Sequence, residues 1–489
     1  MSQPSLTKSR PPFELGERDL ERLLTRLQLA VKRARRAGKD VLATISVPLP
    51  ADVDPSAVVF ASKRAGEQWF AFEQPDRGRV ALATLGEVAH LGASGPDRFA
   101  VVADRWREMS AAAVADPAEG LGGGPIAVGG FAFAPDGGGS PHWAGFAPAS
   151  LIVPEVALTR RAPRRDRGDT RTEVRLTLAA IAHPDDLVEE LVARLERRLA
   201  ELRDAALPLL DPAPAGRYQV VSAMPPEHYE AAVASAVRLI EAGELEKVVL
   251  AREVQVHAPR AYDPAAVFGV LRDAFPSCFV FCVGRGDATL VAASPELLVR
   301  REGHRVSTLA LAGSTRRSAD PAVDDHLGEQ LLRDESYREE HAIVARRIER
   351  ALRPHAVWVA AAPEPELVRI ANIQHLATPI RAQLAKPIET LELAGLMHPT
   401  PAVGGEPAAP ALRQIPALEG LDRGWYAGPI GWIDGAGDGE FCVALRCALL
   451  RGSVARCYAG NGIVRDSDPA KELAETEIKL QALLPLLAG

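Results

Sequence analysis

The chain has 489 residues, of which 47% are hydrophobic and 25% are charged, and its formal net charge is −7 at pH 7. This composition is typical of a globular protein with a large core, and the length predicts two domains or one large duplicated architecture. The negative charge argues against nucleic acid as a partner. No run reaches the roughly 18 uninterrupted apolar residues that a membrane span needs, which argues against a membrane partner.

The first half of the chain mixes helices with groups of strands. Residues 1–14 are expected to form a disordered tail, and the leucine spacing over 15–37 predicts a helix whose basic end, 32–36, faces solvent. Further strands are predicted over 41–49, 57–64, 69–75, 79–86 and 174–182, helices over about 97–115 and 184–204, a glycine-rich strand pair over 122–135 and a polar loop over 162–171.

A proline-rich connector over 206–217 separates this N-terminal half, 15–205, from a C-terminal half, 218–489, which begins again with a helix. Strands are predicted over 247–258, 278–284, 289–313 and 424–435, and long helices near 322–353 and 469–487. The strands come in consecutive antiparallel-looking runs with helices between the groups, which favours the α+β class. GPIAVGGFAF in the first half resembles AGPIGWIDG in the second, which hints at an internal duplication.

The cysteines and the N-terminus indicate a compartment. All five cysteines lie after residue 270, and the pairs in the strand-like runs have no histidines at zinc-site spacing. The N-terminus carries early acidic residues and lacks the apolar core of a signal peptide. We therefore expect buried free thiols in a cytoplasmic protein, where a reducing environment keeps thiols unpaired.

The last third of the chain places charged side chains in apolar surroundings. Arg446 lies inside the apolar run 441–450, and Tyr458 precedes the glycine pair of AGNGIV. Glu472, Glu475 and Lys479 follow at helical positions i, i+3 and i+7, so two carboxylates and an ammonium share one face. The arrangement predicts a cation-assisted anion site. The alternative is that Glu475 and Lys479 form a surface ion pair worth a few tenths of a kcal/mol.

Two further residues are candidates for proton transfer. Lys247 begins the strand KVVLARE, where a lysine either extends its ammonium to the edge or, when buried, loses its proton near neutral pH and acts as a base. Glu296 follows Pro295, which fixes the backbone and aims the carboxylate. The alternative for Glu296 is a capping role at a turn.

Glu340 is a candidate metal ligand. It precedes His341 and apolar residues, so we expect it to face the core, whereas Glu339 faces water and pairs with nearby arginines. Two or three carboxylates that converge from separate helices suit Mg²⁺, a hard cation that prefers oxygen ligands. The glycines of AGNGIV and LALAGSTRR offer backbone amides that can approach a carboxylate. HLATPI and HPTPAVGG have no metal-site spacing.

Short blocks in the second half occur in the order of a known enzyme family. They are KVVLAR, SPELLVRREG, LALAGSTRR, REEHAIV, HLATPI, HPTPAVGG, YAGPIGW, GEFCVALRCA, YAGNGIV and DPAKELAETEIKL. With these blocks, over about residues 220–489, the chain resembles the chorismate-utilising enzymes and, within them, isochorismate synthase. The resemblance implies an α+β fold, a large layered α/β/β/α sandwich with two pseudo-symmetric halves, and a site mostly in the C-terminal half.

The resemblance also implies roles for individual residues. Lys247 would be the base that activates water for attack at C2 of chorismate, and Glu296 the acid that protonates the departing C4 hydroxyl. Glu340 and Glu475 would bind Mg²⁺, with Glu472 nearby. The substrate carboxylates would be contacted by Arg446, Tyr458, Lys479 and the amides of Gly460 and Gly462. Gly313 and Thr378 would line the ring pocket.

Particular residues separate the relatives. Anthranilate synthase usually has glutamine where this chain has Lys247, and aminodeoxychorismate synthase has a nucleophilic lysine where this chain has Ala312. Water is therefore the expected nucleophile, and no glutaminase subunit is required. The chain is expected to be a monomer or a weak homodimer. Salicylate synthase, anthranilate synthase component I and a non-catalytic paralogue remain alternatives, as do menaquinone and siderophore synthesis for the product. Asn461 departs from the commoner Ala-Gly-Ala-Gly form of its block.

Overall fold

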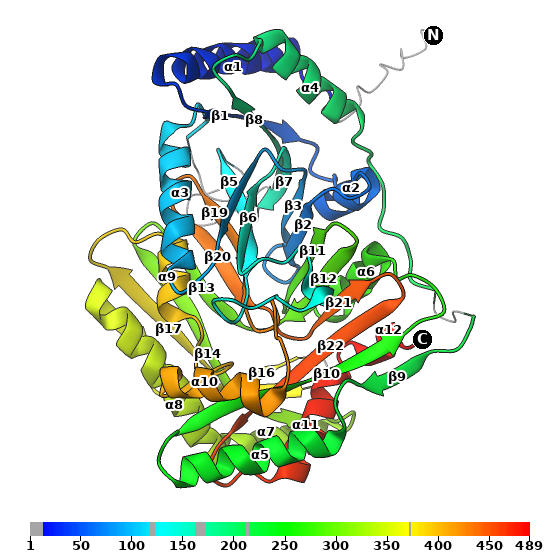
Figure 1. Ribbon diagram of the computed structural model, residues 1–489, viewed down its shortest axis with the longest axis vertical. Helices are drawn as coiled ribbons and strands as arrows, with labels where there is room; N and C mark the ends of the chain where they lie inside the picture. Colours follow the sequence, from blue (N-terminus) through cyan, green and yellow to red (C-terminus); the bar gives the residue numbers. More distant parts are fainter. Residues whose placement is uncertain (1–12, 118–122, 162–171, 212–214, 371–372) are drawn as a thin grey trace, which may run out of the picture.

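The computed structural model describes residues 13–117, 123–161, 172–211, 215–370 and 373–489, and it is built on two large sheets (Figure 1). Neighbouring strands in both sheets pair antiparallel, as the α+β prediction requires. The predicted tail lies outside the described residues except for its last two positions, and the predicted polar loop over 162–171 lies outside them completely.

Within the described residues, the first sheet has twelve strands and the second has ten. The first sheet runs in the order β1 (Val41–Leu49), β8 (Glu173–Ala182), β7 (Val156–Arg161), β3 (Val80–Leu85), β2 (Trp69–Gln74), β11 (Phe279–Arg285), β12 (Ala288–Ser294), β21 (Cys447–Arg451), β22 (Val454–Ile463), β10 (Lys247–His257) and β18 (Gly405–Glu406), with β9 (Gln219–Ser222) beside β10. The second runs β15 (Ala356–Ala361), β17 (Ile373–Leu384), β14 (Arg305–Arg316), β13 (Leu297–Glu302), β20 (Gly439–Val443), β19 (Pro429–Asp434), β5 (Ile126–Phe131), β6 (Ala149–Val153) and β4 (Ala89–Ala93), with β16 (Glu366–Arg369) beside β17.

Helices cover the outer faces of the sheets. They are α1 (Glu17–Ala37), α2 (Pro55–Ser62), α3 (Arg98–Ala112), α4 (Val188–Ala200), α5 (Pro226–Glu241), α6 (Pro264–Ala274), α7 (Pro321–Arg333), α8 (Glu335–Leu352), α9 (Thr390–Met397), α10 (Ala408–Glu419), α11 (Pro469–Leu480) and α12 (Leu484–Leu487), with short 3₁₀ turns at Pro141–Trp143 and Arg353–His355. Helices α1 and α4 lie over β1 and β8, at the end of the molecule remote from β10 and β22 (Figure 1). No helix in the described residues is long and apolar enough to cross a membrane.

The core has two layers. Between the sheets, Phe72 of the first sheet and Phe441 of the second belong to one buried cluster. Between the first sheet and its outer helices, a second cluster contains Leu27 of α1 and Phe268 of α6. Two sheets face to face with helices outside them form the layered sandwich that the family resemblance implies.

Both sheets contain strands from both predicted halves of the chain. In the first sheet β2 pairs with β11, with Phe72 opposite Phe281. In the second sheet β5 pairs with β19, with Gly130 opposite Ile430. The two segments that resemble each other in sequence are therefore adjacent strands. Because the halves share both sheets, the division at the proline-rich connector stays a prediction about domains.

Two predictions of local structure were wrong. Residues 57–64, predicted as a strand, belong mostly to α2, because the Asp54 carboxylate accepts a hydrogen bond from the Ala57 backbone amide at 3.1 Å and Pro55 occupies the first turn. A short apolar run fits either a buried helix or a buried strand. The predicted strand pair over 122–135 contains only β5 among its described residues, and β5 pairs with β6 and β19 instead.

The helical stretch predicted near 322–353 is divided into α7 and α8. Asp334 stands between them in an extended conformation, and its carboxylate accepts hydrogen bonds from the backbone amides of Ser336 and Tyr337 at 2.9 and 3.3 Å. An aspartate cap begins a new helix, so α8 can turn its own face toward the sheet. All five cysteines are buried free thiols, as predicted.

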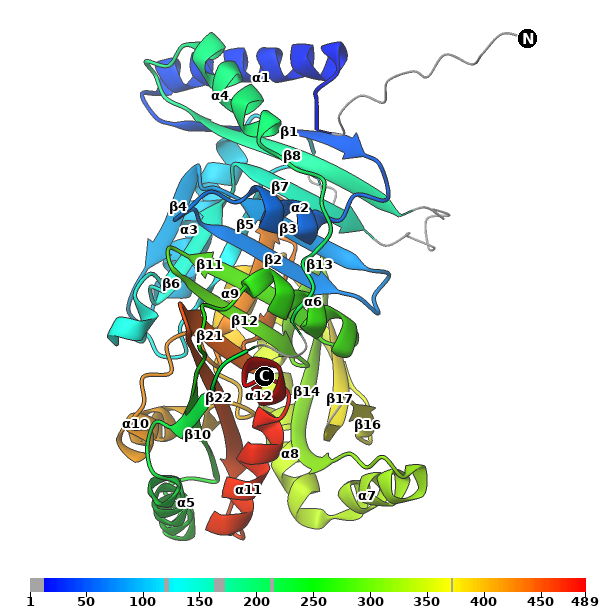
Figure 2. The same ribbon diagram turned by 90° about the vertical axis from the view of Figure 1, so that its right-hand side faces the viewer.

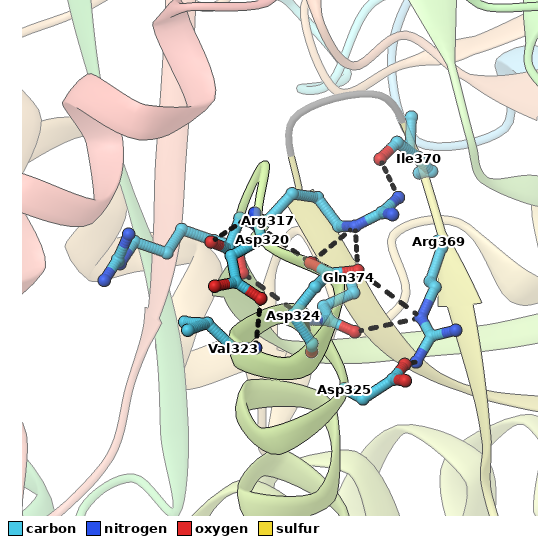
Figure 3. A network of polar contacts seen from close by, with 10 residues as sticks. Arg317, Asp320, Val323, Asp324, Asp325, Arg369, Ile370 and Gln374 are labelled. Atoms are coloured by element: carbon cyan, nitrogen blue, oxygen red, sulfur yellow. Dashed lines mark hydrogen bonds and ion pairs between the residues drawn. The ribbon is translucent and has the colours of Figure 1, made fainter.

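A network of polar contacts ties α7 to the ends of β14 and β17 (Figure 3). The Arg317 Nε donates to both carboxylate oxygens of Asp324 at 2.9 Å, and the Gln374 Nε2 donates to the Asp324 carbonyl at 3.1 Å. These contacts fix the strand ends that carry Ser314 and His375. The network therefore positions one wall of the cavity described next.

Candidate active site

A cavity of about 560 Å³ lies among β10, β14, β17, β22, α8 and α11. Figure 2 shows α11 alongside β22 in this region. The predicted site residues that line the cavity are Glu296, Gly313, Glu340, Arg446, Tyr458, Gly460, Gly462, Glu472, Glu475 and Lys479. The structure thus brings together residues from six separate segments of the C-terminal half.

Lys247 lies directly beneath this cavity rather than in its lining. Its side chain is only 1% exposed, and its Nζ donates to the Glu340 Oε1 at 2.8 Å. The pair meets at Gly462, where an added Cβ would overlap the Glu340 carboxylate and lie 2.6 Å from the Lys247 Cε. Glycine at this position therefore opens the path by which Lys247 reaches the cavity floor.

Glu296 lies in the turn between β12 and β13. Its backbone is held on both sides, because its amide donates to the Ser294 Oγ at 3.3 Å and its carbonyl accepts from the Val443 amide at 3.0 Å. Burial raises the pKa of Glu296 to about 8, although the positive charge of Lys247 acts in the opposite direction. The side chain is therefore a protonated acid at neutral pH.

The carboxylates of α11 differ in their surroundings. Burial acts to raise the pKa of Glu475, but Lys479 and Ser314 bring it below its ordinary value, since the Glu475 Oε1 accepts from the Lys479 Nζ at 2.8 Å and from the Ser314 Oγ at 2.7 Å. Burial raises the pKa of Glu472 to about 7, and the neighbouring charge of Glu475 adds to the rise. Glu475 is thus ionised at neutral pH, whereas Glu472 titrates near neutral pH.

Oxygen ligands of this kind suit Mg²⁺. Glu340, Glu472 and Glu475 all line this one cavity, so their negative charges would be neutralised by a cation bound there. They are not gathered as a ready-made cluster, because the described residues contain no group of three acidic, histidine or cysteine side chains close enough to hold a metal ion. Each is instead held by a polar partner. The three carboxylates therefore fit a hard cation once they exchange their present polar partners for the metal ion.

Arg446 enters the cavity from a strained turn. Its backbone has a φ of 48°, which is unusual for a residue other than glycine, and its Nη2 lies 3.2 Å from the His375 Nε2. Burial, and then the charge of Arg446, hold the pKa of His375 well below its usual range. Because arginine only donates hydrogen bonds, the neutral imidazole of His375 accepts at Nε2 and orients the guanidinium.

The strand β22 supplies Tyr458 and the two glycines. The Tyr458 ring is stacked between Tyr426 and Trp143, with centroid distances of 5.2 and 5.7 Å. The Gly460 carbonyl accepts a hydrogen bond from the Lys479 Nζ at 3.0 Å. Contacts from the amides of the two glycines to a substrate carboxylate stay a prediction.

The two predicted residues of the ring pocket are placed differently. Gly313 lines the cavity with a φ of 73°, at a bulge where β14 loses register with β17. Thr378 does not line it, because its hydroxyl is turned to the His341 Nε2 at 2.7 Å. Burial lowers the pKa of His341 to about 4, so this imidazole is neutral. Thr378 therefore acts on the pocket only through its neighbours.

A family model described as chorismate binding enzyme matches residues 29–488, which is nearly the whole described chain. The chain belongs to the chorismate-binding enzymes. The cavity is lined by carboxylates, cationic side chains and glycines from the sequence blocks that resemble this family. The match includes both halves of the chain.

Named relatives cover most of the chain. An isochorismate synthase of salicylate biosynthesis from Pseudomonas aeruginosa is 36% identical over 94% of this chain and 93% of its own length. The isochorismate synthase MenF of Bacillus subtilis is 32% identical over 88% of this chain and 89% of its own length.

Solved structures share the fold. MenF, the menaquinone-specific isochorismate synthase of Escherichia coli, has a TM-score of 0.75 at 26% identity and covers 94% of this chain and 99% of its own. Anthranilate synthase component I of Streptococcus pneumoniae, at 21% identity and a TM-score of 0.62 over 82% of this chain and 91% of its own, shares the architecture.

Some residues of this cavity were not predicted as site residues. Ser314, His375 and Tyr426 line the cavity, and Asn461 contacts two of its charged residues. Ser314 follows the glycine of LALAGSTRR, a block noted for its backbone amides, and His375 begins HLATPI, a block noted as having no metal-site spacing. Their partners come from distant segments, so no local pattern identified them.

Proposed function

We propose that the chain isomerises chorismate to isochorismate by adding water at C2 and releasing the C4 hydroxyl. The observation that carries the proposal is the pairing of a buried lysine with a protonated buried acid at one cavity. Lys247 reaches the floor beside Gly462, and Glu296 is neutral because of burial. Attack by water needs a proton acceptor, and loss of a hydroxyl needs a proton donor.

The reaction balances without an oxidant or a second substrate. The water oxygen forms a bond to C2 while a proton of the water passes to the Lys247 Nζ, which can accept it once the lysine has released its own proton. The ring double bonds shift, the bond from C4 to oxygen breaks, and the departing hydroxyl takes the proton of Glu296. One water molecule enters and one leaves, so product and substrate are isomers. A proton exchange between the two side chains and solvent restores the starting state.

Cationic side chains fit the charges of the substrate. Arg446 is oriented by His375, and Lys479 extends over the cavity from α11. These two cations suit the two carboxylates of chorismate. Glu340, Glu475 and Glu472 would hold Mg²⁺, which when bound supplies neutralisation of a substrate carboxylate at the reacting ring.

Two features of the chain favour water over ammonia as the nucleophile. Lys247 supplies a base, which ammonia does not require, since ammonia is already a nucleophile. Ala312 stands on β14 where a nucleophilic lysine would give an aminated product by another route. The relatives that cover most of the chain are named isochorismate synthases, which supports the same assignment.

The test is conversion of chorismate by the purified chain with Mg²⁺, without glutamine or a partner protein, and with chromatography of the products. We expect isochorismate to accumulate, and we expect chelation with EDTA to stop its formation. Salicylate with pyruvate as the main products would identify a salicylate synthase instead. Anthranilate formed from added ammonium would contradict the role of Lys247.

A further inference from the structure

Asn461 lies between the two glycines of β22 and is 2% exposed. Its amide spans two charged residues at opposite ends of α11. The Oδ1 accepts from the Lys479 Nζ at 2.7 Å, and the Nδ2 donates to the Glu472 Oε2 at 3.0 Å and to the Glu472 carbonyl at 2.6 Å. A buried amide that uses both its donor and its acceptor on functional residues has a defined orientation.

The contact with Asn461 is one of three that hold the Lys479 ammonium. The same Nζ donates to the Gly460 carbonyl at 3.0 Å and pairs with the Glu475 Oε1 at 2.8 Å. Lys479 also lines the cavity, so its charge acts on a ligand there. Lys479 is therefore held in one place, at the Glu475 side of the cavity.

The contact with Asn461 also directs Glu472. One carboxylate oxygen of Glu472 accepts from the Ser467 Oγ at 2.7 Å, and the other accepts from Asn461. Two neutral donors hold this carboxylate, whereas Glu475 is held by the ammonium of Lys479. Glu472 can therefore face the cavity without a cationic side chain bound to it.

We propose that Asn461 is a positioning residue that keeps Lys479 and Glu472 from pairing with each other. It thereby reserves Lys479 for a substrate carboxylate and Glu472 for the divalent cation. This inference rests on the proposed function. An alanine at 461 would free one N–H of Lys479 and one oxygen of Glu472, and the opposite charges would attract. The resulting pair would compete with both ligands.

The experiment compares Asn461→Ala, Asn461→Asp and Ser467→Ala with the unmodified chain. Calorimetry gives the Mg²⁺ dissociation constant without substrate, and steady-state kinetics give KM and kcat for chorismate. For Asn461→Ala we expect the Mg²⁺ dissociation constant and KM each to rise by about tenfold, which is the scale for loss of a group that orients a metal ligand.

The other two variants separate the two contacts. Asn461→Asp loses the donor to Glu472 and gives Lys479 a carboxylate partner, which competes with the substrate, so KM should rise as it does in Asn461→Ala. Ser467→Ala removes only a donor to Glu472 and should weaken Mg²⁺ binding without raising KM. If Asn461→Ala does not fold, a KM that rises in Asn461→Asp and not in Ser467→Ala supports the positioning role, and a KM unchanged in both overturns it.

The outcomes distinguish this inference from the proposed function. An unmodified chain that produces isochorismate, with Asn461 variants of unchanged Mg²⁺ affinity and KM, would overturn the positioning role and leave the function intact. A lower melting temperature as the only change in these variants would overturn it in the same way. Mg²⁺ affinity that depends on Asn461 in a chain without isochorismate synthesis would support the positioning role and contradict the function.

Discussion

Lys247, which is buried, forms an ion pair with Glu340, which lines the cavity, with 2.8 Å between the Nζ and the Oε1. The lysine begins β10 in the first sheet, and the glutamate lies on α8, which packs on the second sheet. The proposed base is therefore in contact with a proposed metal ligand. A change at either residue should affect both proton transfer and metal binding.

Lys247→Gln should remove hydration at C2 while the chain still binds chorismate. Glutamine cannot accept the proton of water, but its amide can still donate to Glu340 and prevents an unpaired buried carboxylate. Loss of a general base lowers kcat by about 10²- to 10⁴-fold. Stopped assays with chromatography measure turnover, and calorimetry measures binding. Near-normal turnover by this variant would rule out Lys247 as the base.

The pH dependence should reveal Glu296. Its pKa of about 8 in the folded protein lies above the ordinary value of 4.5. Between these pH values the folded state binds more protons than the unfolded state. The contribution of this residue to stability is therefore full below pH 4.5 and is lost as the pH rises through 8. Melting temperatures measured from pH 5 to 9 should fall less steeply for Glu296→Gln, since an amide does not titrate.

Activity should depend on the same proton. The kcat of the unmodified chain should fall as the pH rises above about 8, where Glu296 loses its proton. Glu296→Gln should be almost inactive at every pH because an amide donates a proton poorly. Retention of the alkaline decline in a still-active Glu296→Gln variant would assign the decline to another group.

Gly462→Ala should inactivate the chain without unfolding it. The added Cβ would overlap the Glu340 carboxylate and approach the Lys247 Cε, and both are ends of flexible side chains that can move. We expect kcat to fall by about 10²-fold or more, because base and metal ligand are displaced together. Gly139→Ala is the control, since no atom lies within 4 Å of its added Cβ. If Gly462→Ala and Gly139→Ala have equal kcat and KM, the close approach of Lys247 and Glu340 to Gly462 is not important for activity.

His375 should affect the KM for chorismate through its contact with Arg446. His375→Phe removes the acceptor at 3.2 Å and should raise KM for chorismate by about tenfold with a smaller effect on kcat, because a hydrogen bond to a charged group is lost. His375→Gln keeps an acceptor and should restore part of the affinity. If His375→Phe lowers kcat without raising KM, and His375→Gln behaves in the same way, His375 does not position Arg446.

The sequence predicted which residues converge on the cavity better than it predicted the local fold. Most proposed site residues lie in distinctive blocks, and the structure brings ten of them to one cavity. By contrast, the apolar run at 57–64 fits a strand as well as a helix, and the decision came from the cap at Asp54. The break at Asp334 between α7 and α8 has the same origin.

Contacts between distant segments could not be predicted from one sequence. The pairing of Lys247 with Glu340, and of Arg446 with His375, joins residues from different strands and helices. Asn461 was noticed only as a departure from a common pattern, yet its amide links Lys479 to Glu472. Such roles depend on three-dimensional placement, which local periodicity does not contain.

The most direct test of the central claim is the reaction of chorismate in water enriched in heavy oxygen, with Mg²⁺ and with mass spectrometry of the product. If water activated by Lys247 attacks C2, isochorismate should contain one heavy oxygen, at the C2 hydroxyl, and the released hydroxyl should contain none. Isochorismate without heavy oxygen would mean that the C4 hydroxyl migrates within the molecule. That result, or the absence of isochorismate, would contradict the account.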